Sequence, residues 1–191
     1  MRNLHKKVDS TQNAQNVAKK YRIQLTSLLF PRNQFKGGYL QVCRDLGILC
    51  IRGNEHSYLY DARNGEEESL FRRALRLVDA YLNISGHNCY TDEYLKSKHP
   101  VDIPSSRFLR PYSAKLKILD GLRLKRIKSG MTYAAKNGRT YHLWWHPHNF
   151  GINYKENFAF LEKILDHYSQ LSQKYNFQSH TMSGLAKLLT Q

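Results

Sequence analysis

Cysteine and long hydrophobic runs are both scarce in this chain. Its three cysteines form no Cys-x-x-Cys pair, and this odd number of thiols argues against a disulfide framework and indicates a reducing compartment. No run approaches the ~20 apolar residues of a membrane-spanning helix. Residues 1–7 are followed by a polar stretch rather than by the apolar core of a signal peptide. We therefore expect a cytoplasmic protein without a membrane span.

Acidic residues are also few, because 15 Asp and Glu stand against 30 Lys and Arg and give a formal net charge of +15. In residues 107–139, called the basic block below, Asp120 stands alone against Arg107, Arg110, Lys115, Lys117, Arg123, Lys125, Arg126, Lys128, Lys136 and Arg139. Such a block attracts anions such as nucleic acid, an acidic membrane surface or an acidic glycan. A solvated helix face that keeps a protein soluble has the same pattern.

The rest of the sequence alternates helical and strand-like segments, without repeats or low-complexity tracts. A length of 191 residues and a hydrophobic content of 41% suit one folded domain over residues 1–191. Periodicity and capping residues predict helices over residues 10–21, 37–46, 66–82, 116–131 (with Gly138 as a C-terminal cap), 153–171 and 181–189. In the helix over 66–82, the apolar residues expected to face inward include Leu70 and Leu82. Apolar runs predict strands over residues 23–30, 48–51, 108–112 and 140–146, with an irregular excursion over 83–105. This order favours an α/β fold in which crossover helices join parallel strands.

Residues 141–151 (YHLWWHPHNFG) concentrate three histidines and two tryptophans in a strand-like run that stops at Pro147. Strand alternation predicts two faces, with His142, Trp144 and His146 on one and Leu143 and Trp145 on the other. Because proline cannot donate a ladder hydrogen bond, the strand should end near His146 and leave its imidazole within reach of a ligand. A buried strand with hydrogen-bonded histidines is the structural alternative.

Zinc binding by the three histidines of this run is a further alternative, since imidazole is a common zinc ligand. A catalytic zinc needs three converging ligands, however, and Pro147 breaks the regular geometry between His146 and His148. Trp144 and Trp145 cannot both face a ligand, because neighbouring side chains on a strand point to opposite sides. One of these two tryptophans is therefore expected in the core, and the other could stack on a sugar ring.

Four segments carry a family resemblance: residues 27–34 (SLLFPRNQ), the turn at Gly47, residues 106–112 (SRFLRPY) and residues 142–151 (HLWWHPHNFG). Together they resemble the C-terminal portion of a polysaccharide deacetylase of the NodB-homology type, over nearly the whole chain. The resemblance implies a partial (β/α) barrel with a divalent metal, zinc or similar, at the C-terminal ends of its strands in the complete family domain. It also implies that metal-bound water hydrolyses acetyl groups on sugars.

The family's five motifs transfer unequally to this sequence. The first two, which supply a base Asp, a metal-binding Asp and two His ligands, are lacking, because the chain has no Asp-Asp pair and no His-x3-His before residue 23. At the third motif's position, residues 30–32 (FPR) hold proline and arginine in reversed order, and Arg32 would orient the catalytic carboxylate. Residues 52–55 (RGNE) depart from the fourth motif's Asp and Trp pair. The fifth motif, a strand that ends in a general-acid histidine, is matched at His146.

The resemblance therefore implies His146 and Arg32 as catalytic residues, with substrate contacts from Arg110, Tyr112, Trp144, Trp145, His148 and Asn149. No metal ligand is expected in this chain, so a longer protein or a separate polypeptide would supply the missing motifs. The isolated chain is expected to be inactive, because the metal makes the attacking water nucleophilic. The expected partner is an acetylated sugar or polysaccharide, and the open edge of an incomplete barrel favours self-association.

Structural and functional alternatives accompany these assignments. Arg32 could be a solvent-facing turn arginine behind a proline that stops a strand, and Arg110 could stabilise the 107–112 turn by bonding backbone carbonyls. The same pocket could belong to a non-catalytic carbohydrate-binding remnant. Binding of nucleic acid through the basic block is less favoured, since no helix-turn-helix, zinc-knuckle or RNP-like signature accompanies it, and such binding would be non-specific.

Overall fold

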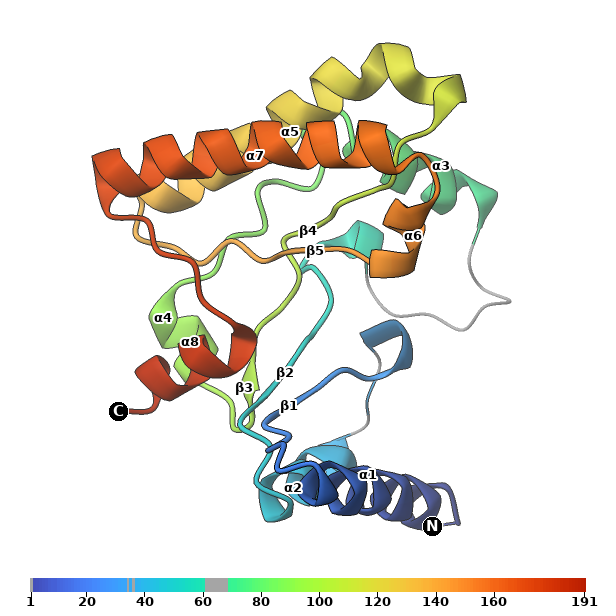
Figure 1. Cartoon of the computed structure of the whole chain (residues 1–191), viewed down its shortest axis with the longest axis vertical. Coiled ribbons are helices and arrows are strands. Elements are labelled where there is room, and N and C mark those ends of the chain that lie inside the picture. Colours follow the sequence, from blue (N-terminus) through green and yellow to red (C-terminus); the bar gives the residue numbers. More distant parts are fainter. Residues whose placement is uncertain (1, 34, 36, 61–68) are drawn as a thin grey trace. The chain divides into compact units, whose positions relative to one another are not determined.

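The computed structural model describes residues 2–33, 35, 37–60 and 69–191 (Figure 1). The chain divides into two compact units. The first unit comprises residues 1–53, 92–103 and 180–191, and the second comprises residues 54–91 and 104–179. Each unit has its own small parallel sheet, and residues 141–151 belong to the second. The single domain over residues 1–191 and the partial (β/α) barrel both stay predictions.

The first unit is built on the strand order β1 (Ser27–Leu28), β2 (Cys50–Ile51) and β3 (Val101–Asp102), all parallel. Its helices are α1 (Arg2–Lys20), α2 (Gly37–Asp45), α4 (Asp92–Lys96) and α8 (Met182–Leu189), with a 3-10 turn η1 (Pro31–Asn33). Gly47 follows α2 with a φ of 71°, a left-handed conformation that glycine adopts without strain. The predicted helix stop at Gly47 is confirmed, and Ile48 and Ile51 then enter a small core with Phe30 and Cys43.

In the second unit, strands β4 (Arg107–Phe108) and β5 (Leu143–Trp144) pair in parallel, with Phe108 opposite Trp144. The helical elements of this unit are η2 (Tyr58–Tyr60), α3 (Leu70–Asp79), η4 (Ala114–Leu119), α5 (Asp120–Lys136), α6 (Pro147–Gly151) and α7 (Tyr154–Tyr175). The long helices α5 and α7 run alongside each other and are in contact (Figure 1). They form the layer that supports the β4–β5 pair.

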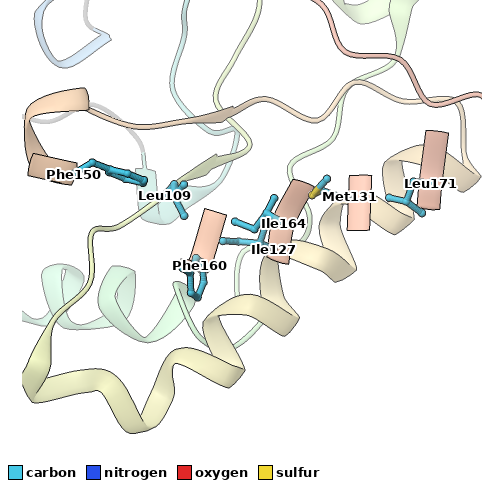
Figure 2. Packing of buried hydrophobic residues seen from close by; sticks show 7 residues of the cluster. All are labelled: Leu109, Ile127, Met131, Phe150, Phe160, Ile164 and Leu171. Atoms are coloured by element: carbon cyan, nitrogen blue, oxygen red, sulfur yellow. The ribbon is translucent and has the colours of Figure 1, made fainter. Parts of the chain in front are cut away.

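The core of the second unit lies between α5, α7 and the segments that follow β4 and β5. Its buried members are Leu109, Ile127, Met131, Phe150, Phe160, Ile164 and Leu171, shown in Figure 2. Burial of each such side chain contributes roughly 1.5–3 kcal/mol. Leu143 packs against this cluster from β5, and Tyr141 packs against it from just before the strand. Packing against α5 and α7 therefore fixes the position of β5, on which the predicted site depends.

Some predicted element boundaries are wrong. α1 begins at Arg2 rather than at a cap near Ser10. The first turns escaped prediction because they are polar and carry no apolar periodicity. Residues 83–105, expected to be irregular, contain α4 and β3. Residues 147–151 form the short helix α6, since proline is favourable at the first helical position. Asn153 precedes α7 as predicted, but its φ of 56° is left-handed and its side chain makes no cap bond.

The helix predicted over residues 66–82 differs most from the structure. α3 begins at Leu70, where Ser69 Oγ accepts a hydrogen bond from the Arg72 backbone nitrogen, and the acids at 66–68 lie outside the described residues. Leu70 and Leu82, both predicted to face inward, are 81% and 51% exposed. Arg72 and Asp79 are buried instead. Partners elsewhere in the unit, rather than apolar periodicity, determine the orientation of this helix.

A glycine in α5 permits a close approach to the strand segment that leads into the site. A Cβ atom at Gly130 would lie 2.6 Å from Cε2 of the Tyr141 ring, whereas a Cβ at Gly121 in the same helix would meet nothing within 4 Å. We expect Gly130→Ala to destabilise the second unit by ~1–3 kcal/mol through overpacking. Gly121→Ala is the matched control and should be neutral or slightly stabilising, because alanine has the higher helix propensity.

Urea unfolding followed by tryptophan fluorescence measures this difference, since Trp144 and Trp145, the two tryptophans of the chain, lie in the second unit. Equal midpoints for Gly130→Ala and Gly121→Ala would contradict the close contact between α5 and Tyr141.

Candidate functional site

The carboxyl ends of β4 and β5 lie side by side, because the two strands are parallel and in register. Ligand sites of α/β proteins commonly form at this end of parallel strands. Beyond β5 the chain stays extended through His146, and α6 then begins at Pro147. His146 is the N-cap residue of that helix, and its side chain makes no cap bond. The strand predicted over 140–146 is shorter than expected, since β5 ends at Trp144, but the extended segment does stop before Pro147 and the His146 side chain is exposed.

The predicted alternation along this strand is also confirmed for four side chains. The rings of Trp144 and His146 meet edge to face, with centroids 5.2 Å apart. On the opposite side, Leu143 packs against the core cluster and the Trp145 ring lies 5.8 Å from Phe150, a member of that cluster. Trp145 is therefore the tryptophan that faces the core, although 37% of it stays exposed. Trp144 is the tryptophan that faces the candidate site.

Four aromatic side chains form a series of ring contacts that extends from β4 and β5 to α6. We call Phe108, Trp144, His146 and His148 the aromatic cluster. The Phe108 and Trp144 centroids are 4.6 Å apart, and those of Phe108 and His146 are 5.8 Å apart. His146 and His148 stack with centroids 5.2 Å apart and planes inclined by 24°. Both histidines are exposed, whereas Phe108 and Trp144 are half-buried. The cluster offers an apolar ring surface next to two imidazoles, which can donate, accept and transfer protons.

A polar chain lies beneath the aromatic cluster. Trp144 Nε1 donates a hydrogen bond to Ser105 Oγ over 2.6 Å, and Ser105 Oγ donates to Glu55 Oε1 over 2.8 Å. Ser105 is completely buried, and Glu55 is 7% exposed. Burial raises the pKa of the Glu55 carboxyl, although the hydrogen bond from Ser105 and the nearby Arg107 charge act in the opposite direction. The buried Glu55 carboxyl is thus linked to the Trp144 indole through the hydroxyl of Ser105.

The same unit contains a buried ion network around Asp79. Asp79 is fully buried and receives Arg107 Nη1 at 2.5 Å on Oδ2, while Arg126 Nη2 lies 3.6 Å from Oδ1. The Tyr60 hydroxyl and the Ser85 backbone and hydroxyl also bond this carboxylate. Burial alone would raise the pKa of Asp79, but the Arg107 guanidinium and these hydrogen bonds lower it to about 2. Asp79 is therefore a structural anion, held ionised by its partners.

Three members of the basic block are internal rather than solvated. Arg107, Arg123 and Arg126 are all buried. Arg123 contacts the Asp120 carboxylate at 3.0 Å, the carbonyls of Arg110 and Pro111 at 2.5 and 3.2 Å, and the face of the Phe160 ring at 3.9 Å. The solvated-face interpretation is wrong for these three residues, and anion binding by the block would fall to the others. Sequence alone gave no sign of this division, because buried Arg123 and Arg126 and exposed Lys125 stand close together in one helix.

The other predicted substrate-contacting residues lie around the same strand ends. Arg110 is half-buried, and Arg123 rather than Arg110 bonds the carbonyls of the 107–112 turn. The Tyr112 backbone nitrogen donates to Asn157 Oδ1 over 2.6 Å, which ties this turn to α7. The backbone nitrogen of Asn149 donates to the His146 carbonyl over 3.0 Å within α6. Arg110, Tyr112 and Asn149 keep their substrate role as a prediction.

Arg32 belongs to η1 of the first unit, and its side chain lies outside the residues whose side chains are described. Its catalytic role therefore stays a prediction. Glu55 and Ser105, by contrast, are site residues that sequence reasoning missed. The one available signal was that Glu55 falls at the position of the fourth family motif, where the sequence departs from the family pattern.

The described part of the chain contains no group of three His, Cys, Asp or Glu side chains placed to hold a metal ion. The stacked imidazoles of His146 and His148 present ring faces to each other instead of converging on one point. The described residues therefore do not by themselves provide the metal centre that the resemblance implies for the complete family domain. Among the same residues, no helix is long and apolar enough to cross a membrane.

The arrangement offers two chemical capabilities at one strand end: an amphipathic ring surface, and an exposed imidazole placed to exchange a proton with whatever lies on that surface. Comparison of the chain with protein-family models, with curated proteins and with solved structures finds no match.

Proposed function

We propose that the second unit binds an acetylated sugar ring at the aromatic cluster, as part of a polysaccharide-deacetylase-like hydrolase. One observation carries this proposal: the exposed His146 imidazole lies edge to face with the Trp144 indole at the carboxyl end of β5. The apolar C–H faces of a sugar ring suit aromatic surfaces, and its hydroxyl and acetamido groups suit the adjoining imidazoles. The resemblance of residues 142–151 to the family's fifth motif supports the same assignment.

In this proposal the residues have separate tasks. Trp144 and Phe108 bind and orient the sugar ring, and His148 bonds its polar substituents. Water adds to the acetyl carbonyl, the bond from that carbon to the sugar nitrogen or oxygen breaks to give acetate, and His146 donates a proton to the departing nitrogen or oxygen, a general-acid task that imidazole often performs. Because the described residues do not fit a metal site, no step of this account uses one.

Sugar binding is the part of this proposal that can be tested directly on this protein. We expect N-acetylglucosamine oligomers to bind more tightly than the matching deacetylated oligomers. We expect Trp144→Ala and His146→Ala each to weaken that binding about 10-fold or more, because each removes a ring from the contact surface. Isothermal titration calorimetry measures both comparisons at constant pH and salt.

His180→Ala is the matched control, since His180 is an exposed histidine of the first unit and lies outside the aromatic cluster. It should bind like the wild type. Unchanged affinity in both Trp144→Ala and His146→Ala, with both proteins folded, would refute the assignment of the sugar site. No acetate release is expected from the isolated chain, because the motifs that would supply the metal ligands are lacking.

A further inference from the structure

We infer that Glu55, acting through Ser105, is the positioning residue that holds the Trp144 indole in place within the aromatic cluster. The two residues make a continuous hydrogen-bonded chain with Trp144, of 2.6 Å and 2.8 Å. They join β5 to two segments far away in the sequence, because Ser105 is 39 residues from Trp144 and 50 from Glu55. The role of Trp144 in ligand binding, though not its orientation, rests on the function proposed above.

The donors and acceptors available in this hydrogen-bonded chain give it one direction. An indole Nε1–H can only donate, so Ser105 Oγ must accept from Trp144. The single hydroxyl proton of Ser105 is then left for Glu55, and Glu55 Oε1 accepts it. A carboxyl oxygen can play this part whether or not the other oxygen carries a proton. Trp144, Ser105 and Glu55 therefore each have a defined donor or acceptor role, and the indole ring has one favoured orientation.

Burial of Ser105 and Glu55 makes this hydrogen-bonded chain an effective support for the Trp144 indole. Ser105 is completely buried and Glu55 nearly so, so that bulk water has little access to replace either partner. Hydrogen bonds are stronger in such surroundings, and an unpaired group is costly there. Ser105 is itself held from a second direction, because its carbonyl accepts a hydrogen bond of 3.0 Å from the Tyr90 hydroxyl. The N–H edge of Trp144 is thus anchored in the interior, while its ring meets Phe108 and His146.

The indole proton of Trp144 reports on this chain directly. The protein has two tryptophans, so its NMR spectrum contains two indole N–H signals, and Trp145 serves as the internal reference. We expect Ser105→Ala to shift the Trp144 signal and to speed its hydrogen exchange about 10-fold or more, because its acceptor is lost. Glu55→Ala should act in the same direction, and Glu55→Gln should retain the slow exchange, since its amide oxygen can still accept from Ser105.

Ser106→Ala is the matched control, because Ser106 is an equally buried neighbour whose hydroxyl accepts from the His142 backbone nitrogen. It should leave the Trp144 indole signal and its exchange unchanged. An unchanged Trp144 signal in folded Ser105→Ala would overturn the inference. So would equal effects of Ser105→Ala and Ser106→Ala, which would indicate general loosening of the unit.

Affinity for N-acetylglucosamine oligomers, measured on the same variants, keeps the two proposals apart. If Ser105→Ala alters the indole signal and weakens sugar binding, and Ser105→Thr restores both, Glu55 and Ser105 position the binding surface. If Ser105→Ala changes the Trp144 indole signal but neither Ser105→Ala nor Trp144→Ala changes the affinity for the sugar, the positioning role stands and the sugar site is refuted.

Discussion

Replacing Asp79 by alanine is expected to destabilise the second unit by about 3–5 kcal/mol, the largest effect of any single substitution proposed for this chain. The change removes the carboxylate that pairs with Arg107 and Arg126 and leaves two buried guanidinium groups without their anion. It also leaves the Tyr60 hydroxyl and the Ser85 hydroxyl without their acceptor. Urea unfolding followed by tryptophan fluorescence would measure the loss.

Asp166→Ala provides the control, because Asp166 is an exposed aspartate of α7, and its replacement should change stability by less than about 0.5 kcal/mol. The low pKa of Asp79 adds an internal check. Its pKa falls from 3.8 to about 2 on folding, so its stabilising effect is fully present above pH ~4 and is lost as the pH falls towards 2. The stability gap between wild type and Asp79→Asn should narrow over that range. A gap that stays constant would contradict the ion network.

Local sequence signals predicted the parts of this fold that depend on neighbouring residues. The glycine stop after α2, the C-terminal helix after Thr181 and the strand alternation before Pro147 all follow from φ preferences, capping or side-chain period, which act over a few residues. Thr181 Oγ1 indeed accepts a hydrogen bond of 3.0 Å from the Gly184 backbone nitrogen at the start of α8. Such features need no knowledge of distant partners.

Features that depend on distant partners were not predictable in this way. Apolar periodicity placed Leu70 and Leu82 inside, but α3 buries Arg72 and Asp79 because their partners come from other segments, including Arg107 on β4. A buried arginine has the same sequence appearance as a solvated one, so the basic block could not be divided beforehand.

The candidate site shows the same limit at closer range. Its part on the strand, with Trp144 and His146 on one face, could be predicted because five consecutive residues specify it. Its buried part could not, since Ser105 lies 39 residues from Trp144 in the sequence and Glu55 lies 50 residues from Ser105. Long-range hydrogen bonds between ordinary residue types leave no periodic trace in a single sequence.

The general-acid role proposed for His146 predicts a further large effect, on turnover. With the family's two metal-binding motifs supplied ahead of residue 1 or on a second polypeptide, we expect acetate release from N-acetylglucosamine oligomers. His146→Ala should then lower kcat by about 10²-fold or more, the usual range for loss of a general acid. His146→Gln should lower kcat comparably, because an amide can donate a hydrogen bond but cannot transfer the proton at an ordinary pH.

The distribution of the loss between kcat and KM decides between proton transfer and ring contact. Loss of a proton donor acts in the transition state, so His146→Gln should reduce kcat far more than it raises KM, whereas Trp144→Ala should act mainly on KM. His146→Ala should also recover part of its kcat with substrates whose leaving group needs no proton, such as activated aryl acetates. Equal losses on activated and unactivated substrates would assign His146 to binding alone, which its edge-to-face contact with Trp144 also permits.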